Sequence, residues 1–216
     1  MIVATFSGSK GGTGKTTLAV CLSVVSGAVL PTLLVDASSE GGATAYLLGD
    51  TAPPYLREDP ERSLRRVESD SVQVTVAVNR GPLLNIEVVA RHVEAWSRSY
   101  GLVVVDLPAL TDAEAVERYM PLLRAADAIL VVVEPNPAAL AASLYRFGGK
   151  RAVIALNQPR PYPMAVVNHY SSVLRVFCRN AGCDYVVVPY EPAISRLGPG
   201  SLRVLGYTRE EFDAAI

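Results

Sequence analysis

Long apolar runs and cysteines are scarce in this sequence of 216 residues. No apolar run reaches the roughly 18 residues that a transmembrane helix needs, so we expect no membrane partner. Residues 1–6 include no basic segment, which argues against a secretory signal. The three cysteines, Cys21, Cys178 and Cys183, form neither a CxxC pair nor a disulfide framework. This cysteine usage predicts a reducing, cytoplasmic environment.

Charged residues are also few, at 19%, whereas hydrophobic residues make up 50%. These proportions exclude a disordered chain and a coiled coil. The length suffices for the core of one α/β domain, and we expect a single domain over 1–216. The charges are unevenly placed: residues 1–140 carry 11 Lys and Arg against 16 Asp and Glu, and residues 141–216 carry 9 against 5. The excess of basic residues in 141–216, next to an acidic region at 1–140, indicates a polyanionic partner.

Short, continuous, valine-rich runs recur along the chain, a pattern typical of parallel strands that are buried on both faces. These runs are 2–6, 32–35, 102–105, 128–133, 152–156 and 185–188. Helical stretches separate them, at 16–26, 84–97, 112–120, 137–147 and 164–180. The alternation predicts a doubly wound α/β fold, a mostly parallel sheet with helices on both faces. The alternating run 72–78 is placed nearer an edge, and Pro121 is expected to end or kink its helix.

A glycine-rich loop lies between the first expected strand and the first expected helix. Residues 7–17 read Ser-Gly-Ser-Lys-Gly-Gly-Thr-Gly-Lys-Thr-Thr, in the context that a phosphate-binding loop requires. Glycines let successive backbone N–H groups point into one concavity that holds phosphate oxygens. Lys15 supplies a positive charge to the β- and γ-phosphates, and the Thr16 hydroxyl is placed to ligate Mg²⁺. The residues predicted to bind nucleotide are Gly11, Gly12, Thr13, Gly14, Lys15, Thr16 and Thr17.

The loop departs from the strict G-x-x-x-x-G-K-[ST] pattern because Ser9 occupies the first glycine position, and it carries a second lysine, Lys10. In this it resembles the loop of the deviant Walker A ATPases, the ParA and MinD proteins and their relatives. The resemblance implies the P-loop NTPase fold, ATP and Mg²⁺ as cofactors, and a catalytic role for both lysines. In such proteins the lysine at the place of Lys10 reaches the phosphates of the partner subunit in an ATP-sandwich homodimer.

Two aspartates extend the resemblance. Segment 33–44 lines up with the partition family's DxDPQGNAT segment, and 102–108 fits the Walker B pattern of an apolar strand followed by Asp-x-Pro. Asp36 and Asp106 both end a strand, where an α/β sheet binds its ligand. The resemblance implies that they help to hold Mg²⁺ and its waters. A strand-end aspartate taken alone is more often an ordinary helix cap.

Ser38 stands where the second aspartate of the DxD pattern orients or deprotonates the attacking water. A serine hydroxyl accepts no proton at neutral pH, and loss of a general base typically costs about 10²–10⁴ in rate. Glu40 either substitutes for this base or matches only the family's glutamine. We therefore predict nucleotide binding with slow hydrolysis.

Two positions late in the chain resemble the family's adenine-side residues. Asn157 ends an expected strand, and an amide can donate to and accept from adenine at once. Pro189 follows the last expected strand and resembles the second adenine-side loop. Asparagine at a strand end is also common in turns.

The basic third of the chain includes an amphipathic helix at 164–180. The expected core stripe consists of Val166, Tyr170, Val173, Leu174 and Phe177. Arg175 and Arg179 fall on the opposite face, where they are either non-specific DNA contacts or part of a solvated surface.

The motifs favour one branch of the family over others. The chain has no CxxC for an iron–sulfur cluster, its C-terminal residues 207–216 are acidic rather than a basic membrane helix, and Lys10 disfavours a metabolic ligase of the same fold. The sequence most resembles small ParA-like proteins, which implies an ATP-dependent switch for chromosome or plasmid partition that is nucleoid-associated in the cytoplasm. The resemblance implies a ParB-like centromere-binding partner. The alternative is a weakly hydrolysing, MinD-like scaffold that positions a protein cargo.

Overall fold

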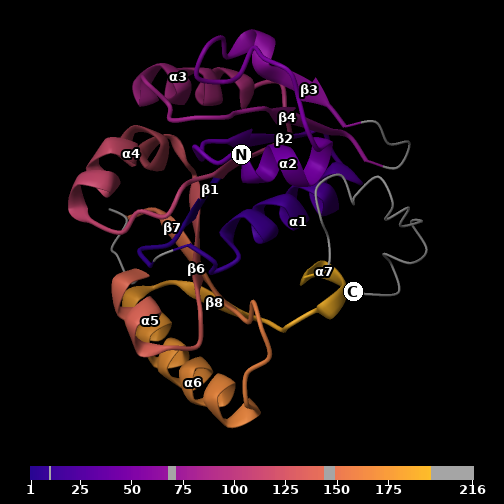
Figure 1. The fold of residues 1–216 in the computed structure, drawn as a ribbon. Coiled ribbons are helices and arrows are strands. Elements are labelled where there is room, and N and C mark those ends of the chain that lie inside the picture. The colour runs from indigo at the N-terminus through magenta and orange to yellow at the C-terminus, as the bar shows by residue number, and fades with distance from the viewer. Residues whose placement is uncertain (10, 68–71, 144–148, 196–216) are drawn as a thin grey trace.

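The computed structural model describes residues 1–9, 11–67, 72–143 and 149–195, and these contain one sheet of eight strands (Figure 1). The strand order is β3-β4-β2-β5-β1-β6-β7-β8. The strands are β1 (Ile2–Phe6), β2 (Thr32–Asp36), β3 (Leu64–Arg66), β4 (Val74–Ala77), β5 (Leu102–Asp106), β6 (Ala128–Val133), β7 (Arg151–Asn157) and β8 (Asp184–Val188). Every neighbouring pair is parallel except β3 and β4, which are antiparallel. The predicted mostly parallel α/β sheet is thereby confirmed.

Helices cover both faces of the sheet. They are α1 (Lys15–Gly27), α2 (Gly42–Leu48), α3 (Ile86–Trp96), α4 (Ala113–Ala125), α5 (Pro137–Ser143), α6 (Met164–Ala181) and α7 (Pro192–Ser195), with a 3-10 turn, η1, at Glu61–Ser63. The strands alternate: Leu34 contributes to a core with α1 and α2, whereas Leu33 and Val35 contribute to the core that holds α3, α4 and α6. Figure 1 shows α3 and α4 together at one end and α5 and α6 at the other.

Some local predictions need correction. Pro121 does not end its helix: it lies inside α4, which continues to Ala125 because Leu122 and Leu123 pack into the core. Val173 was placed in the core stripe of its helix, but it is 37% exposed. The buried side chains of α6 are instead Val167, Leu174 and Cys178.

Two of the cysteines form a pair that their spacing did not suggest. Helix α6 ends at Ala181, and the left-handed conformation of the next residue, Gly182, turns the chain back. Cys183 N donates to Cys178 O at 3.1 Å, and the two side chains form a disulfide. The expectation that the cysteines form no disulfide is therefore wrong for this pair, while Cys21 is free.

No helix in the described ranges has the length and apolar character needed to cross a bilayer. Strand β1 lies between β5 and β6; the connection that leaves β1 runs to β2 toward one edge of the sheet, whereas the connection that leaves its neighbour β6 runs to β7 toward the other edge. In such sheets the ligand site lies outside the carboxyl ends of the strands, at the point where the strand order reverses. The loop that follows β1 is therefore at that point.

Candidate nucleotide-binding site

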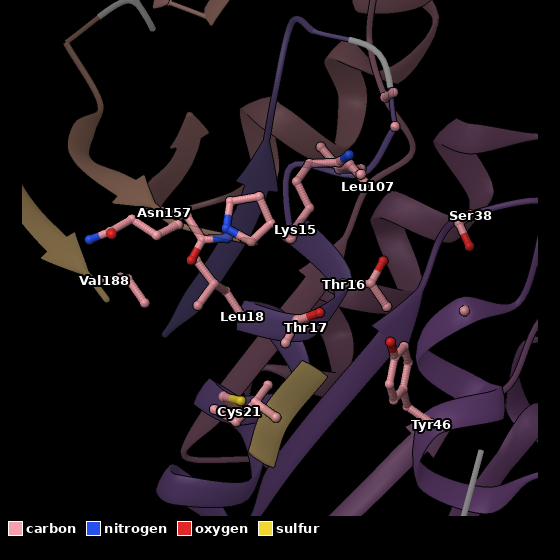
Figure 2. A pocket seen from close by; sticks show the side chains of 18 of the residues that line it. Lys15, Thr16, Thr17, Leu18, Cys21, Ser38, Tyr46, Leu107, Asn157 and Val188 are labelled. Atoms are coloured by element: carbon pink, nitrogen blue, oxygen red, sulfur yellow. The ribbon is translucent and has the colours of Figure 1, made fainter. Parts of the chain in front are cut away.

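A cavity of about 520 Å³ opens at the carboxyl edge of the sheet around the start of α1. Figure 2 shows Asn157 and Val188 on one side of this helix start and Ser38 and Tyr46 on the other. The predicted binding residues that line it are Gly11, Gly12, Gly14, Lys15, Thr16, Thr17, Asn157 and Pro189. The volume falls within the usual range for small-molecule sites.

The loop after β1 requires glycine where its backbone is left-handed. Gly12 has φ +93° and Gly14 has φ +88°, conformations that residues with a Cβ rarely adopt. At Gly14 a Cβ would also lie 2.2 Å from Asn157 Nδ2. Helix α1 starts at the next residue, and Leu18 N donates to Gly14 O at 2.9 Å. The amides before Leu18 have no partner within the helix, so the loop and helix start form an anion-binding end.

Lys15 provides a positive charge at this N-terminal end of α1. Its residue is only 7% exposed although it begins a helix beside an open cavity. Burial lowers the pKa of its ammonium group, and the carboxylates of Asp106 and Glu40 act in the opposite direction. A desolvated ammonium beside unpaired amides can bind phosphate oxygens strongly.

Asp36 is buried and held by four donors. The amide and hydroxyl of Ser38 donate to its Oδ1 at 3.2 and 2.8 Å. The amide and hydroxyl of Thr44, in α2, donate to its Oδ2 at 2.9 and 2.8 Å. Burial raises the pKa of Asp36, and these donors lower it. Asp36 therefore organises the two segments that follow β2.

Asp106 lies directly beside Asp36, because the two residues are register partners in β5 and β2. Its residue is fully buried, and its Oδ1 accepts from the Thr5 hydroxyl at 3.3 Å. Its Oδ2 accepts no hydrogen bond from any described residue. Burial, with Asp36 as the second cause, raises the pKa of Asp106 to about 7, against the opposing effects of Thr16, Lys15 and Thr5.

These groups fit a magnesium ion. A buried carboxylate oxygen without a partner is an open ligand position, and the Thr16 side chain lies near the same carboxylate. Within the described ranges, no cluster of three or more His, Cys, Asp or Glu forms a cage. Mg²⁺ commonly takes one or two protein oxygens and completes its shell with phosphates and water. Asp106 and Thr16 could hold the ion, with Asp36 acting on its waters.

The opposite wall of the cavity comes from β7 and β8. Asn157 is buried, and its Nδ2 donates to Thr13 O at 2.7 Å. Thr13, within the loop, is buried and does not line the cavity, and its hydroxyl is without a partner among the described residues. The structure therefore places Asn157 against the glycine-rich loop as well as in the wall of the cavity.

Other predicted residues have different outcomes. Lys10 lies outside the described residues. Ser38 and the exposed Glu40 both line the cavity, and the Ser38 hydroxyl is occupied as a donor to Asp36. Arg175 and Arg179 are exposed on α6 and do not line the cavity; Arg175 Nε donates to the Tyr185 hydroxyl at 3.3 Å.

Cys21 and Tyr46 line the cavity, although the sequence motifs gave them no role. Cys21 lies four residues after Thr17 on α1, so helical periodicity from the loop offers a signal for it. Tyr46 lies in α2, a helix that the sequence patterns did not indicate.

No protein-family model matches the sequence, and no curated relative matches it. Solved structures do match. The septum site-determining protein MinD of Pyrococcus horikoshii OT3, complexed with Mg-ADP, is 17% identical, with 98% of this chain and 91% of that chain covered and a TM-score of 0.71. Apo McdA of Cyanothece is 14% identical (98% and 96% covered, TM-score 0.68).

A third match is a putative plasmid partition protein, BB_S35, from Borrelia burgdorferi B31 bound to AMPPNP. It is 16% identical, with 90% of this chain and 87% of that chain covered and a TM-score of 0.67. At identities this low, the structural likeness establishes the fold alone. The cavity lies at the loop between β1 and α1, which is the nucleotide-binding loop in a P-loop fold. The chain thus has the P-loop fold of the MinD, McdA and ParA-type ATPases.

Proposed function

We propose that this protein is a single-domain ATP-dependent switch that dimerises around ATP and serves DNA partition, with weak hydrolysis and non-specific DNA binding. One observation carries the proposal: Gly12, Gly14 and the buried Lys15 line one cavity at the ends of β2 and β5. The two adjacent, fully buried aspartates Asp36 and Asp106 end these strands, and residues just after them, Ser38 and Leu107, line the same cavity. That arrangement offers a phosphate site at Lys15 and, next to it, a metal site at Thr16 and Asp106. Solved neighbours of the same fold hold Mg-ADP and AMPPNP, which supports the choice of nucleotide.

Each residue has a definite part in this proposal. The loop amides and Lys15 bind the phosphates of ATP, and Mg²⁺, when bound, neutralises their charge and orients them for in-line attack. Thr16 and Asp106 ligate the ion, and Asp36 holds its waters. Asn157 and Pro189 border the adenine. Lys10 acts on the phosphates of the second subunit.

DNA and a ParB-like protein complete the proposed partition system, which would operate on the nucleoid in the cytoplasm. The excess of basic residues over 141–216 supports a polyanion. The charge of Arg151 is offset by Asp184, with which it pairs at 3.3 Å, whereas the partner of Arg175 is the Tyr185 hydroxyl. The second candidate is a scaffold that positions a protein cargo. It is favoured by the match to a septum site-determining protein and by Ser38, whose hydroxyl is a donor rather than a base.

The dimerisation step gives the test of this function. Light scattering with ATP and Mg²⁺ should show the 23.0 kDa chain doubling in mass. We expect Lys15→Ala to lose ATP binding and to stay monomeric. Lys10→Ala should still bind ATP, because Lys15 serves the phosphates within one subunit, but should fail to dimerise.

Lys150→Ala is the matched control for this experiment. The Lys150 ammonium donates to the carbonyls of Arg124 and Ala126 at 2.6 and 2.7 Å, so it stabilises the end of α4 away from the cavity. This variant should dimerise like the wild type. A Lys10→Ala protein that dimerises with ATP would rule out the sandwich, and a wild type that binds no ATP would rule out the function.

DNA binding is tested on α6. Combining Arg175→Glu with Arg179→Glu should weaken binding to every DNA sequence and lower the salt dependence of log K by about 2, one unit for each lost phosphate contact. The control combines Arg91→Glu with Arg98→Glu, which makes the same charge change at exposed positions on and after α3. Equal affinity losses in the two double variants would reject α6 as the DNA surface.

A further inference from the structure

The segment that contains Ser38 and Glu40 is hydrogen-bonded to the residues that follow β4. Asn79, just after that strand, donates through Nδ2 to Ser38 O at 2.8 Å and to Gly81 O at 3.1 Å. Gly81 N donates to Ser39 O at 2.8 Å. The two backbones also meet closely, since a Cβ at Gly41 would lie 2.5 Å from Asn79 O. The β4 end and the segment after β2 are therefore joined at several points.

Asn79 also reaches Asp36 by a second route. Its amide N donates to Thr44 Oγ1 at 3.2 Å, and this hydroxyl donates to Asp36 Oδ2 at 2.8 Å. Ser38 Oγ, on the other side, donates to Asp36 Oδ1. One residue thus contacts both segments that supply the donors of Asp36, and it belongs to neither.

A contribution to folding stability does not explain why asparagine occupies position 79. The residue is 1% exposed, and its Oδ1 has no partner among the described residues. Two carbonyl acceptors fix the amide orientation, because both hydrogens of Nδ2 are used and only the oxygen is left over. A buried acceptor without a donor is destabilising. Asparagine is therefore explained by the two hydrogen bonds that its Nδ2 donates, and not by the packing of its side chain.

A second cavity, of about 260 Å³, lies beside this junction. Glu40 lines both cavities, and Asn79 and Gly41 line the second one. The segment after β2 is therefore a thin wall between two open spaces. Without the Asn79 donors it has room to move away from the nucleotide loop.

We infer that Asn79 is the positioning residue of the magnesium side of this site. It holds the Ser38–Gly41 wall and Thr44 in the arrangement that keeps the Asp36 carboxylate in place for the waters of the ion. This inference rests on the proposed function and adds a residue that touches neither nucleotide nor metal. Partners that orient ligand groups in this way typically contribute about 10–100-fold to metal affinity.

Asn79→Asp tests the inference with almost no change in shape. The new carboxylate presents oxygen to the carbonyls of Ser38 and Gly81, so both hydrogen bonds are lost. We expect the Mg²⁺ concentration that half-saturates the Mg²⁺-dependent part of ATP binding to rise about 10–100-fold. ATP binding in EDTA should keep its wild-type affinity. Thr44→Val, which removes the hydroxyl between Asn79 and Asp36, should have the same signature and serves if Asn79→Asp does not fold.

Asn85→Ala is the control. Asn85 lies in the same β4–α3 connection and caps α3 by accepting from Val88 N at 3.1 Å, with no contact to Asp36. It should lower thermal stability and leave the Mg²⁺ requirement unchanged. Equal losses of ATP affinity with Mg²⁺ and with EDTA in Asn79→Asp, or no change in the Mg²⁺ requirement, would overturn the positioning role.

A measurement without nucleotide separates this inference from the proposed function. Hydrogen exchange of the Thr44 and Gly81 amides, which donate to Asp36 and to Ser39, reports on the wall directly. Asn79→Asp should speed both exchanges, and Asn85→Ala should not. Unchanged exchange rejects the inference even if ATP binds. Faster exchange in a protein whose wild type binds no ATP rejects only the function.

Discussion

Replacing Asp106 by asparagine should make the nucleotide-free protein more stable at pH 8 and should abolish the effect of Mg²⁺ on ATP binding. Asp106 is fully buried beside Asp36, and one of its oxygens has no partner among the described residues. Its pKa is raised to about 7, mainly by burial. The folded protein without metal therefore carries an unfavourable charge above neutral pH, and asparagine removes that charge.

The sign of the pH dependence follows from the same shift. An unfolded aspartate titrates near pH 4. Between about pH 4 and pH 7 the folded state binds more protons than the unfolded state, so stability falls as pH rises through this window. The full loss is on the order of 4 kcal/mol, at about 1.4 kcal/mol per pKa unit. Chemical unfolding at pH 5 and pH 8 should show the advantage of Asp106→Asn growing with pH.

Magnesium reverses the preference, because the ion binds the carboxylate form. In the wild type we expect Mg²⁺ to strengthen ATP binding above pH 7 and to lose this effect as Asp106 is protonated below it. Calorimetric titrations with ATP at both pH values measure this. A stability difference between wild type and Asp106→Asn that is the same at pH 5 and pH 8 would contradict the assignment of the buried charge to Asp106.

The sheet and the phosphate loop could be predicted from the sequence because local patterns determine them. The continuous valine runs became β1, β2, β5 and β6 within a residue of their expected bounds. The glycines of the loop were informative since only a left-handed backbone, as at Gly12 and Gly14, needs them. Lys15 and Thr16 then follow from their place at the helix start.

Residues whose roles depend on packing between distant segments left no such pattern. Helix α2 begins at the second of two adjacent glycines, Gly42, and gave no helical signal in the sequence; its Thr44 hydroxyl donates to Asp36 only in the folded chain. Asn79 lies 35 residues beyond Thr44 and resembles any strand-end asparagine in the sequence. Pro121 was expected to end or kink its helix, and it does not end it, because core packing of Leu122 and Leu123 maintains the helix to Ala125.

Replacing Ser38 by aspartate should accelerate ATP hydrolysis by about 10²–10⁴, the usual contribution of a general base. In the wild type we expect turnover below roughly 1 s⁻¹, the low end for enzymes. The reason is geometric as well as chemical. Ser38 Oγ donates its hydrogen to Asp36 Oδ1 at 2.8 Å, so the side chain at this position is hydrogen-bonded to a carboxylate and does not act as a base toward water.

The substitution also has a cost that can be measured separately. Aspartate at position 38 removes a donor to Asp36 and places a like charge beside it, which is unfavourable without a metal ion. Ser38→Asp should therefore unfold at a lower temperature than the wild type in EDTA and recover with Mg²⁺ and ATP. Ser39→Asp is the control, since it adds the same charge one residue along the same cavity wall. It should not accelerate hydrolysis.

Glu40 is the competing candidate for the base. It is exposed, lines the nucleotide cavity and acts electrostatically on Lys15. If it activates the water, Glu40→Gln abolishes turnover and Ser38→Asp adds little. If the site lacks a base, Glu40→Gln leaves the slow wild-type rate unchanged and Ser38→Asp raises it. Single-turnover phosphate release for the three proteins distinguishes these outcomes. A wild type that is already fast and insensitive to both changes would mean that the water is oriented by a group outside the segment after β2.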